Sequence, residues 1–518
     1  MTGLCMNEDN NHFYYNRRSR EVSRADIEAL VDQYADTQVK EFIVNVNAMR
    51  TSYDSKVWDS FWTGYDPEAG DDQQLFQSLP AESRQATRAW IHRAWQIHQG
   101  GLDFCGILLQ RAQEKGLSPW VSVRMNDVHC VDDEAHPLIS GFWRERPELR
   151  RVQHRFTAWT DKAFDFGREE AREHHFQLIE EVVNRYTFDG IELDWMRFAF
   201  HFKPGEEEAG RAHLTAFLRR VRELLDRKGA ERGKRIKIGC RVPSRPQTAF
   251  DLGMDAILWA REGLVDMLVP TPFWETVETD MPIELWKRLL EGSGTMLAAG
   301  LEVLLRTYPA SPLRQTNTLE TVRGTAASFL ARGADRIYLF NYMDSDTAIS
   351  DLHNYPTLLR EAGELGTLQG KPRRHVLTYA DTWSPGEPQA TALPIHLRSG
   401  QNREVRMPIG HKPQPEEEAS VVIAAGSYFS VEQLQVYVNG EACGAGQPVE
   451  LPMPKPEGQA YSYALPTSAM KDGYQMIDFV SVAEQDQTLT IQWVELQIGF
   501  RVEDGLESKN VMEGRNGE

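Results

Sequence analysis

Short apolar runs rich in β-branched residues alternate with helical stretches along the first 370 residues of the chain. This alternation predicts parallel strands joined by crossover helices. The predicted strands are residues 3–8, 41–48, 120–127, 188–195, 236–243, 266–273, 295–303 and 336–343. Between them, residues 168–186 and 212–229 place apolar side chains at helical spacing. Eight strand-helix units predict an α/β fold, a (β/α)8 TIM barrel, in which the long segment 51–116 adds helices or a rim over the mouth.

Beyond residue 370 helical periodicity disappears and short alternating runs take over, such as "SVVIAAGSYF" at 420–429. Asn439 and Gly440 form a hairpin turn signal. We therefore expect a catalytic barrel over 1–370, a β-sandwich over 371–499 and a polar tail over 500–518. Whether the sandwich binds glycan or only packs against the barrel stays open.

Overall composition excludes several classes of function. The net charge of −19 disfavours binding to nucleic acid or to an anionic membrane. The five cysteines are scattered without a CxxC pair, which indicates neither a disulfide framework nor a zinc site. No apolar run approaches the roughly 20 residues of a membrane span, and the first residues lack the apolar core of a signal peptide. We expect a cytoplasmic protein, or a periplasmic or secreted one if the N-terminus is that of a processed form.

The fourth predicted strand, "FDGIELDW", carries two acids inside an apolar run. Side chains alternate between the faces of a strand, so Ile191, Leu193 and Trp195 share one face. That apolar face suits the helix layer, which turns Glu192 and Asp194 into the barrel. The same alternation on other strands directs Arg124, Asn126, Arg241 and Glu302 inward, and on the last strand Tyr342 shares one face with Tyr338 and Phe340.

Ligands of such barrels are bound by residues at the C-terminal ends of the strands and in the loops that follow. Candidates in those loops are Asp127 and His129 after the third strand, Arg197 after the fourth, and Trp274 and Glu275 after the sixth. Asp194 lies nearest the mouth, where a functional role is expected. For the deeper Glu192, a structural ion pair with Arg124 or Arg241 and a functional role are both open. The predicted substrate-binding residues are Arg124, Asn126, Asp127, His129, Arg197, Arg241, Trp274 and Tyr342.

The run "FDGIELDW" resembles the DGxDxDxE signature of family 18 glycoside hydrolases, with Asp189, Glu192 and Asp194 at its acidic positions. Met196 stands where that family carries its catalytic Glu, which argues against its substrate-assisted mechanism. The longer stretch "DGIELDWMRF", together with "RMNDVH" and "FWRERPELR", is similar to poorly characterised glycosyl-hydrolase-like barrels over most of residues 1–370. The resemblance implies one catalytic carboxylate at the end of strand four, Asp194, and another at the end of strand seven or six, Glu302 or Glu275.

These observations lead us to expect a glycoside hydrolase that cleaves an O-glycosidic bond of an oligosaccharide or polysaccharide, without a cofactor or metal. Asp194 is expected to be the ionised nucleophile or base and Glu302 the acid, although the two roles can be reversed. Carboxyl groups about 5–5.5 Å apart indicate retention of configuration, and about 6.5–9.5 Å apart inversion. Arginines 124, 197 and 241 leave open an anionic sugar as substrate.

Two other classes of function remain. Met196 motivates a sugar-binding barrel without catalysis. A metal-dependent hydrolase using Asp127, His129 and Asp194 is the other, although the first strand lacks the HxH pair usual in that class. Sequence alone leaves the oligomeric state unassigned.

Overall fold

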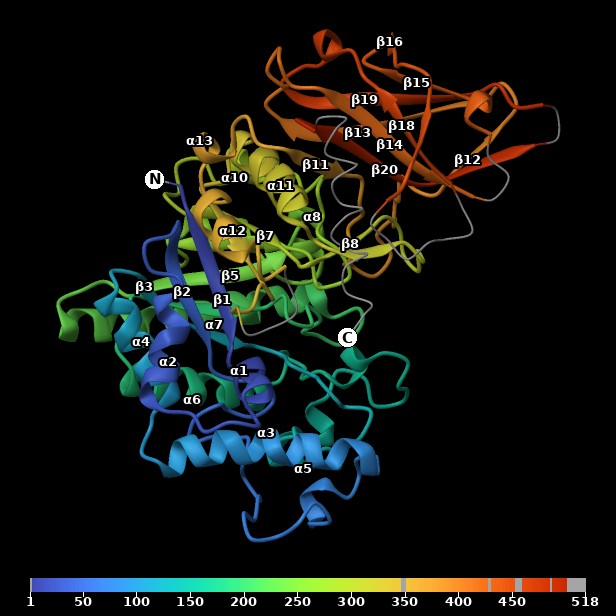
Figure 1. Ribbon diagram of the computed structural model, residues 1–518. Coiled ribbons are helices and arrows are strands. Elements are labelled where there is room, and N and C mark those ends of the chain that lie inside the picture. Colours follow the sequence, from blue (N-terminus) through green and yellow to red (C-terminus); the bar gives the residue numbers. More distant parts are fainter. Residues whose placement is uncertain (1, 346–350, 427–429, 452–458, 485–486, 501–518) are drawn as a thin grey trace, which may run out of the picture.

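The structure is a computed structural model that describes residues 2–345, 351–426, 430–451, 459–484 and 487–500. Within this part, eight parallel strands close into a barrel in the order β1-β2-β3-β4-β5-β6-β7-β10 (Figure 1). The strands are β1 (Leu4–Asp9), β2 (Val39–Asn45), β3 (Ser118–Arg124), β4 (Gly190–Asp194), β5 (Lys237–Pro243), β6 (Met267–Thr271), β7 (Met296–Leu301) and β10 (Arg336–Leu339). The predicted α/β barrel is thus confirmed. Of the predicted tail, 500–518, all but the first residue lies outside the described residues.

Helices surround the barrel. They are α1 (Asn10–Asn16), α2 (Arg24–Asp32), α3 (Ala81–Gln99), α4 (Phe104–Glu114), α5 (Gly141–Glu145), α6 (Glu169–Arg185), α7 (Glu207–Arg232), α8 (Pro246–Asp251), α9 (Ala256–Arg261), α10 (Ile283–Leu289), α11 (Leu319–Ala331), α12 (Tyr355–Glu361) and α13 (Leu365–Leu368). The two helices predicted from periodicity are α6 and α7, while α3 and α4 fill the long segment after β2. Among the described helices, none is both long and apolar enough to cross a membrane.

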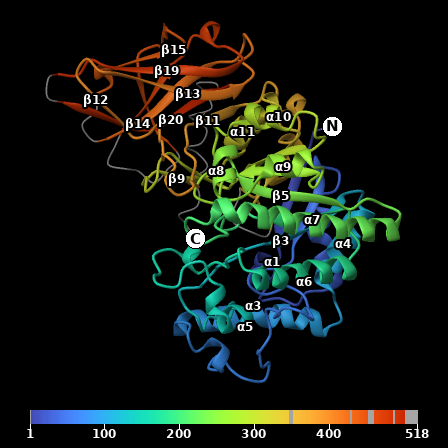
Figure 2. The ribbon, with the colours of Figure 1, turned by 180° about the vertical axis from the view of Figure 1, so that it is seen from behind.

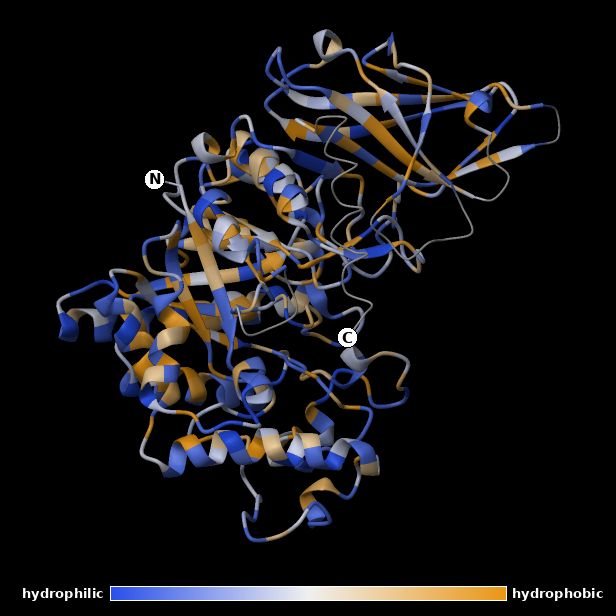
Figure 3. Cartoon of the chain, viewed as in Figure 1, coloured by the Kyte–Doolittle hydropathy of each residue, from blue (hydrophilic) through white to orange (hydrophobic). Residues whose placement is uncertain are grey.

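The barrel interior separates into an apolar lower part and a polar upper part. An apolar cluster inside the barrel includes Ile43, Trp120, Met267 and Tyr338. Trp120 fits because its neighbours on β4 and β5 are glycines: a Cβ at Gly190 would lie 2.4 Å from the indole. The first four strands, β1 to β4, become polar towards their C-terminal ends, as the change from hydrophobic to hydrophilic along β1 shows (Figure 3).

Two antiparallel sheets follow the barrel, consistent with the predicted β-sandwich (Figure 2). One contains β11 (Arg373–Val376), β20 (Thr488–Ile498), β14 (Ala419–Ala425), β18 (Gln459–Ala464) and β17 (Gln447–Val449), with β12 (Ile395–Arg398) also paired to β20. The other contains β13 (Asn402–Gly410), β19 (Gly473–Ser481), β15 (Leu434–Val438) and β16 (Glu441–Ala442). Alternating apolar residues of both sheets form a second core. A short ribbon, β8 (Leu304–Arg306) with β9 (Arg314–Thr316), projects from the barrel after β7.

The sandwich docks on α11 through small residues. A Cβ added at Gly324 of α11 would lie 2.1 Å from the carbonyl oxygen of Arg374 on β11. One turn further, the backbone of Gly410 comes so close to α11 that its Cβ would lie 2.8 Å from the Ala327 carbonyl oxygen. Glycine and alanine therefore allow the first strand of the sandwich to lie directly against a barrel helix.

Substitution of Gly324 by alanine is expected to weaken this docking. The added methyl group meets backbone, which cannot move aside cheaply, so we expect a loss of about 1–3 kcal/mol of stability. Gly366→Ala is the matched control, because no heavy atom lies within 4 Å of its Cβ position in α13. Scanning calorimetry of the two variants measures the difference, and equal thermal midpoints would contradict the role assigned to Gly324.

Candidate active site

The register of three neighbouring strands places Asp194 between two arginines. Asp194 on β4 is paired with Arg124 on β3 and with Arg241 on β5. Its Oδ2 accepts a hydrogen bond from Nη1 of Arg241 at 2.6 Å. Its Oδ1 accepts from the backbone N–H groups of Met196 at 3.1 Å and Arg197 at 2.8 Å. Three donors thus face a side chain that is 1% exposed, an arrangement that binds the ionised carboxylate.

Glu192 lies one inward position deeper on the same strand and is fully buried. Its Oε1 accepts hydrogen bonds from Ser122 Oγ at 2.7 Å, Tyr338 OH at 2.9 Å and Asn7 Nδ2 at 3.3 Å. Its Oε2 has no hydrogen-bond partner among the described residues. Burial, reinforced by the nearby charge of Asp194, raises the pKa of Glu192 to about 7. The deeper acid is therefore tied to the barrel wall, where burial favours its protonated form.

Glu302 follows directly after β7 and is also buried. Nδ2 of Asn341 lies 3.3 and 3.2 Å from its two carboxyl oxygens, and the N–H of Val303 donates to Oε2 at 3.3 Å. Burial raises the pKa of Glu302 to about 8, although Arg241 and Arg197 act in the opposite direction. Asn341 holds a left-handed backbone conformation, with φ of 61°, which asparagine adopts more readily than most residues. Glu302 is thus a carboxyl group that keeps its proton at neutral pH.

Asp127 links Arg124 to a histidine at the mouth. Arg124 donates to Asp9 Oδ2 at 2.5 Å and to Asp127 Oδ2 at 3.3 Å, so its charge is matched by two carboxylates. Nδ1 of His129 lies 2.8 Å from Asp127 Oδ1, and Nε2 lies 2.8 Å from Nη2 of Arg197. Because a guanidinium nitrogen only donates, Nε2 accepts and Nδ1 carries the proton. The pKa of Asp127 is lowered because His129 and Arg124 outweigh the effect of its burial.

Arg197 has no carboxylate within 4 Å among the residues that the structure describes. Its guanidinium carbon lies 5.4 Å from the ring centre of Phe198, 5.6 Å from that of Phe273 and 5.8 Å from that of Phe340. Phe198 itself has φ of 64°, a conformation that costs a bulky residue on the order of 1–3 kcal/mol. Backbone strain of this kind is concentrated at functional sites. Here it accompanies the placement of the Phe198 ring beside the guanidinium of Arg197.

Two side chains that were predicted to bind substrate, those of Asn126 and Tyr342, form hydrogen bonds with backbone groups at the mouth instead. Asn126 donates to the carbonyl oxygens of Phe164 and Phe200 at 3.0 and 3.2 Å, and its Oδ1 accepts from the N–H of Phe164 at 2.8 Å. Tyr342 is buried, and its hydroxyl donates to the carbonyl oxygen of Glu302 at 3.1 Å. Both side chains fix the loops that carry other candidates, and neither offers a free polar atom to the mouth.

The loop after β6 carries the remaining candidates. Glu275 forms an ion pair with Arg306 of β8, while Trp274 is 42% exposed with Arg314 5.7 Å from its ring centre. The carboxylate of Asp381 holds this loop by accepting from the N–H groups of residues 273, 274 and 275 at 2.8, 2.9 and 2.9 Å. The structure thus brings Glu275 to the rim of the mouth, whereas Asp194 binds Arg241 directly and Glu302 lies within the electrostatic influence of the same arginine.

Sequence reasoning missed Asp9, Asn341 and Asp381. Asp9 was detectable, because it shares the inward parity of Cys5 and Asn7 on β1. Asn341 lies in a loop after β10, where strand parity no longer applies. Asp381 follows the first strand of the sandwich, and no local pattern connects it to a barrel loop more than a hundred residues earlier.

One cluster outside the barrel wall has metal-ligand chemistry. Ligand atoms of Glu8, His12 and Asp344 lie within 4.8 Å of one another. Nε2 of His12 lies 2.9 Å from Glu8 and 3.0 Å from Asp344, and Arg17 also pairs with Asp344 at 3.2 Å. The pKa of His12 is raised to about 10 by the two acids despite its burial. Two cations thus already balance two acids, so the set fits a buried ion cluster better than a metal site.

The hydrogen bonds of Asp127, His129 and Asp194 show whether these residues are available to bind a metal ion. Both ring nitrogens of His129 are engaged, one with Asp127 and one with Arg197. The oxygens of Asp194 face Arg241 and two backbone N–H groups. The donor set therefore does not fit a divalent cation without breaking these bonds.

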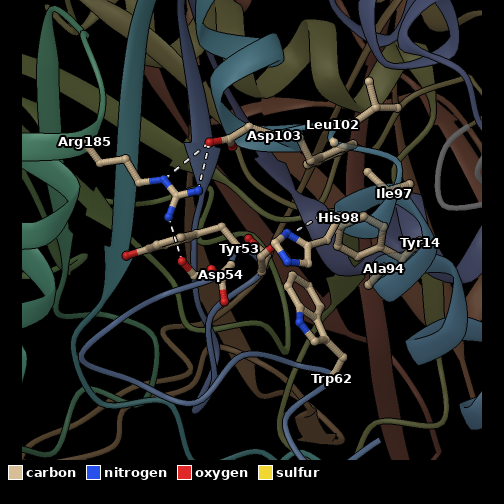
Figure 4. A pocket seen from close by; sticks show the side chains of 13 residues that line it. Tyr14, Tyr53, Asp54, Trp62, Ala94, Ile97, His98, Leu102, Asp103 and Arg185 are labelled. Carbon is tan, nitrogen blue, oxygen red and sulfur yellow. Dashed lines mark hydrogen bonds and ion pairs between the residues drawn. The ribbon is translucent and has the colours of Figure 1, made fainter. Parts of the chain in front are cut away.

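A cavity of about 490 Å³ opens at the rim of the mouth. Its lining includes Phe198, Phe273 and Glu275 from the barrel loops and Asp381 from the segment that leads into the sandwich. A separate cavity of about 210 Å³ lies outside the barrel wall, between α3, the start of α4 and the end of α6 (Figure 4). There Arg185 bonds to Asp103 at 3.0 Å. None of the predicted site residues lines that second cavity.

No family model and no curated protein sequence matches the chain. Solved structures that resemble it include glycoside hydrolases. The glycoside hydrolase domain of PgaB (BpsB) from Bordetella bronchiseptica has a TM-score of 0.40 at 10% identity, covering 70% of this chain and 99% of that one. A family 18 N-acetylglucosaminidase from Paenibacillus barengoltzii gives 0.35 at 11% identity, with coverage of 70% and 100%. Alpha-L-fucosidase isoenzyme 1 from Paenibacillus thiaminolyticus gives 0.35 at 13% identity, with coverage of 93% and 97%. At these scores the likeness carries no argument about activity.

Protonation of Glu302 predicts how stability depends on pH. Its pKa is raised from the ordinary 4.5 to about 8, so the folded protein holds a proton that the unfolded chain releases between these values. The contribution of Glu302 to folding stability is complete below pH 4.5 and is lost as the pH rises through about 8. We expect Glu302→Gln to lose less stability than the wild type between about pH 5 and pH 8.5. Urea unfolding across that range measures this, with the exposed Glu291→Gln as control; parallel curves for wild type and Glu302→Gln would contradict the assignment.

The ion pair between Asp194 and Arg241 predicts that single and double substitutions of these residues have non-additive effects on folding stability. Asp194→Asn leaves the Arg241 guanidinium buried without its carboxylate, which should cost about 3–5 kcal/mol. Arg241→Met added to that variant removes the unpaired charge and should recover a large part of the loss. Thermal unfolding followed by near-ultraviolet circular dichroism compares the variants. Additive losses in the double variant would show that the two side chains are not coupled.

Proposed function

We propose that this chain is a glycoside hydrolase that cleaves an O-glycosidic bond of an oligosaccharide or polysaccharide. The observation that carries the proposal is a pair of buried carboxyl groups in opposed environments at the barrel mouth, one bound by a guanidinium and one bound by neutral donors. Hydrogen bonds from Arg241 and two backbone N–H groups favour ionised Asp194. Burial keeps Glu302 protonated at neutral pH. Opposed environments of two acids in one site are the usual mark of separate acid and base roles.

The chemistry follows from that division. Glycosidic cleavage needs one carboxylic acid to protonate the leaving oxygen and one carboxylate to attack the anomeric carbon or to activate water. Glu302 fits the acid, and Asp194 fits the nucleophile or base. Glu192 supports Asp194 from below, because it shares its strand and is held by Ser122 and Tyr338.

Glu275 is the alternative acid at the rim, but it is neutralised by Arg306. The ion pair occupies its carboxylate, which is then less available to a leaving group. The acid role is therefore better supported for Glu302 than for Glu275.

A second candidate function is a sugar-binding barrel without turnover. It is favoured by the engagement of both oxygens of Asp194, which is only 1% exposed, and by methionine at position 196. An attacking carboxylate must release one of these bonds. Binding of oligosaccharides by the wild type without release of reducing ends would support this candidate.

Kinetics of acid variants test the hydrolase. Asp194→Asn and Glu302→Gln are each expected to lower kcat by about 10²–10⁴-fold on a hydrolysed glycan, because each removes one half of the acid–base pair. The wild-type profile of kcat/KM should fall on the alkaline side near the Glu302 pKa of about 8, since the acid must be protonated. Reducing-end release over a panel of neutral and acidic oligosaccharides provides the measurement.

Glu275→Gln is the discriminating variant in the same assay. A smaller loss than in Glu302→Gln agrees with the assignment of the acid to Glu302, directly after β7. A larger loss, together with an unchanged alkaline limb in Glu302→Gln, would move the acid role to the loop after β6.

A further inference from the structure

We propose that residues 377–391, which join the first strands of the sandwich, form one wall of a sugar-binding cleft at the barrel mouth. In this cleft Trp383 packs against a ring of a neutral oligosaccharide. The inference rests on the proposed function, because it names the class of substrate and the residues that select it.

The segment is anchored to the barrel as part of its mouth. Asp381 accepts three backbone N–H bonds from the loop after β6, as described above. The carboxylate of Glu387 accepts from Thr248 Oγ1 of α8 at 2.9 Å, and also from the N–H and Oγ of Ser384 at 3.0 and 2.9 Å. Two carboxylates thus tie a stretch without helix or strand to the loops that follow β5 and β6. These hydrogen bonds hold the segment in a fixed position against the barrel. A linker that only connected two domains would not need them.

The wall borders the cavity of about 490 Å³ at the rim, which lies within the usual 300–1,000 Å³ range of small-molecule sites. Aromatic rings come from both sides. Tyr379 and Trp383 belong to the segment, while Phe198, Phe200 and Phe273 belong to barrel loops. Nε1 of Trp383 donates to the carbonyl oxygen of Ala380 at 2.8 Å, which fixes the orientation of the indole.

The lining of the cavity is linked to the carboxyl pair through Arg197 and Asp381. The ring centres of Phe198 and Phe273, which line it, lie 5.1 Å apart and both are within 5.6 Å of the Arg197 guanidinium carbon. The N–H of Arg197 bonds to Asp194. The charge of Asp381 acts on Glu302 and raises its pKa. A chain bound in the cleft therefore reaches towards the residues proposed to cleave it.

Charge in the cleft favours a neutral ligand. Arg306 is the cation in the lining of the cavity and is paired with Glu275, while Asp381 is a carboxylate held by backbone donors, so the lining offers no unpaired cation to an anionic sugar. At the mouth, Arg124 and Arg241 are matched by carboxylates as well. Aromatic rings with a few neutralised polar groups suit the apolar faces and hydroxyl groups of a neutral sugar. Two of the three arginines considered for an anionic sugar are thus engaged, and the third, Arg197, does not line the cavity.

Binding measurements on full-length variants test the cleft. Isothermal titration of Glu302→Gln with neutral and uronic-acid oligosaccharides gives Kd while turnover is slowed. Trp383→Ala in this background should raise Kd for the neutral ligand on the order of tenfold, because an aromatic packing surface is lost. Trp383→Phe should keep most of the affinity. Trp62→Ala is the matched control, since Trp62 lines the separate cavity of Figure 4.

The outcomes separate the cleft from the hydrolase. In the wild-type background Trp383→Ala should raise KM with little change in kcat. Hydrolysis with unchanged KM and Kd in Trp383→Ala would overturn the cleft and leave the hydrolase standing. Binding that depends on Trp383 in a wild type without turnover would support the cleft and reject the hydrolase. Preference for uronic-acid chains, or no binding of any glycan, would contradict the cleft as proposed.

Discussion

The buried ion pair between Asp194 and Arg241 organises the upper half of the barrel. Removing two charges from water is unfavourable unless they are paired and further hydrogen-bonded. Here the second carboxylate oxygen binds the N–H groups of Met196 and Arg197, so the same acid that compensates Arg241 also shapes the turn after β4. Arg241 in turn lies 3.6 Å from the ring centre of Phe340, which gives its other face an aromatic surface. The strained Phe198 and the position of Arg197 follow from that turn.

The same arginines divide the carboxyl groups into two kinds. Asp9, Asp127 and Asp194 each contact a guanidinium directly, and the positive charge of that group compensates for the burial of the carboxylate. Glu192 and Glu302 are bound by neutral donors instead, and burial raises the pKa of each. A barrel mouth with matched aspartates and arginines can thus hold protonated glutamates at neutral pH without a net buried charge. Acid and carboxylate in one site are a consequence of this partition.

Strand parity explains both what the sequence predicts correctly and where it fails. Within strands the alternation is rigid, which is why Glu192, Asp194, Arg124 and Arg241 all face inward as expected. Asn126 and Tyr342 lie two and three residues beyond the ends of β3 and β10, where the backbone turns and alternation no longer holds. The left-handed Asn341 changes direction one residue before Tyr342. The role of Asp381 could not be predicted from the sequence for a different reason: its contact with the loop after β6 depends on how the two domains dock.

That docking gives the sandwich a part in the mouth. Gly324 lets β11 lie against α11, and β11 ends at Val376, next to the segment that carries Asp381 and Trp383. The hydrogen bond from the N–H of Leu377 to the carbonyl oxygen of Val494 keeps the start of this segment on the sandwich sheet. Asp381 then fixes its middle on the barrel. The position of the aromatic wall is therefore set from both domains, and a shift of the sandwich on α11 would move Trp383 relative to the loop after β6. Close packing at a distant helix in this way controls the shape of the cleft beside the carboxyl pair.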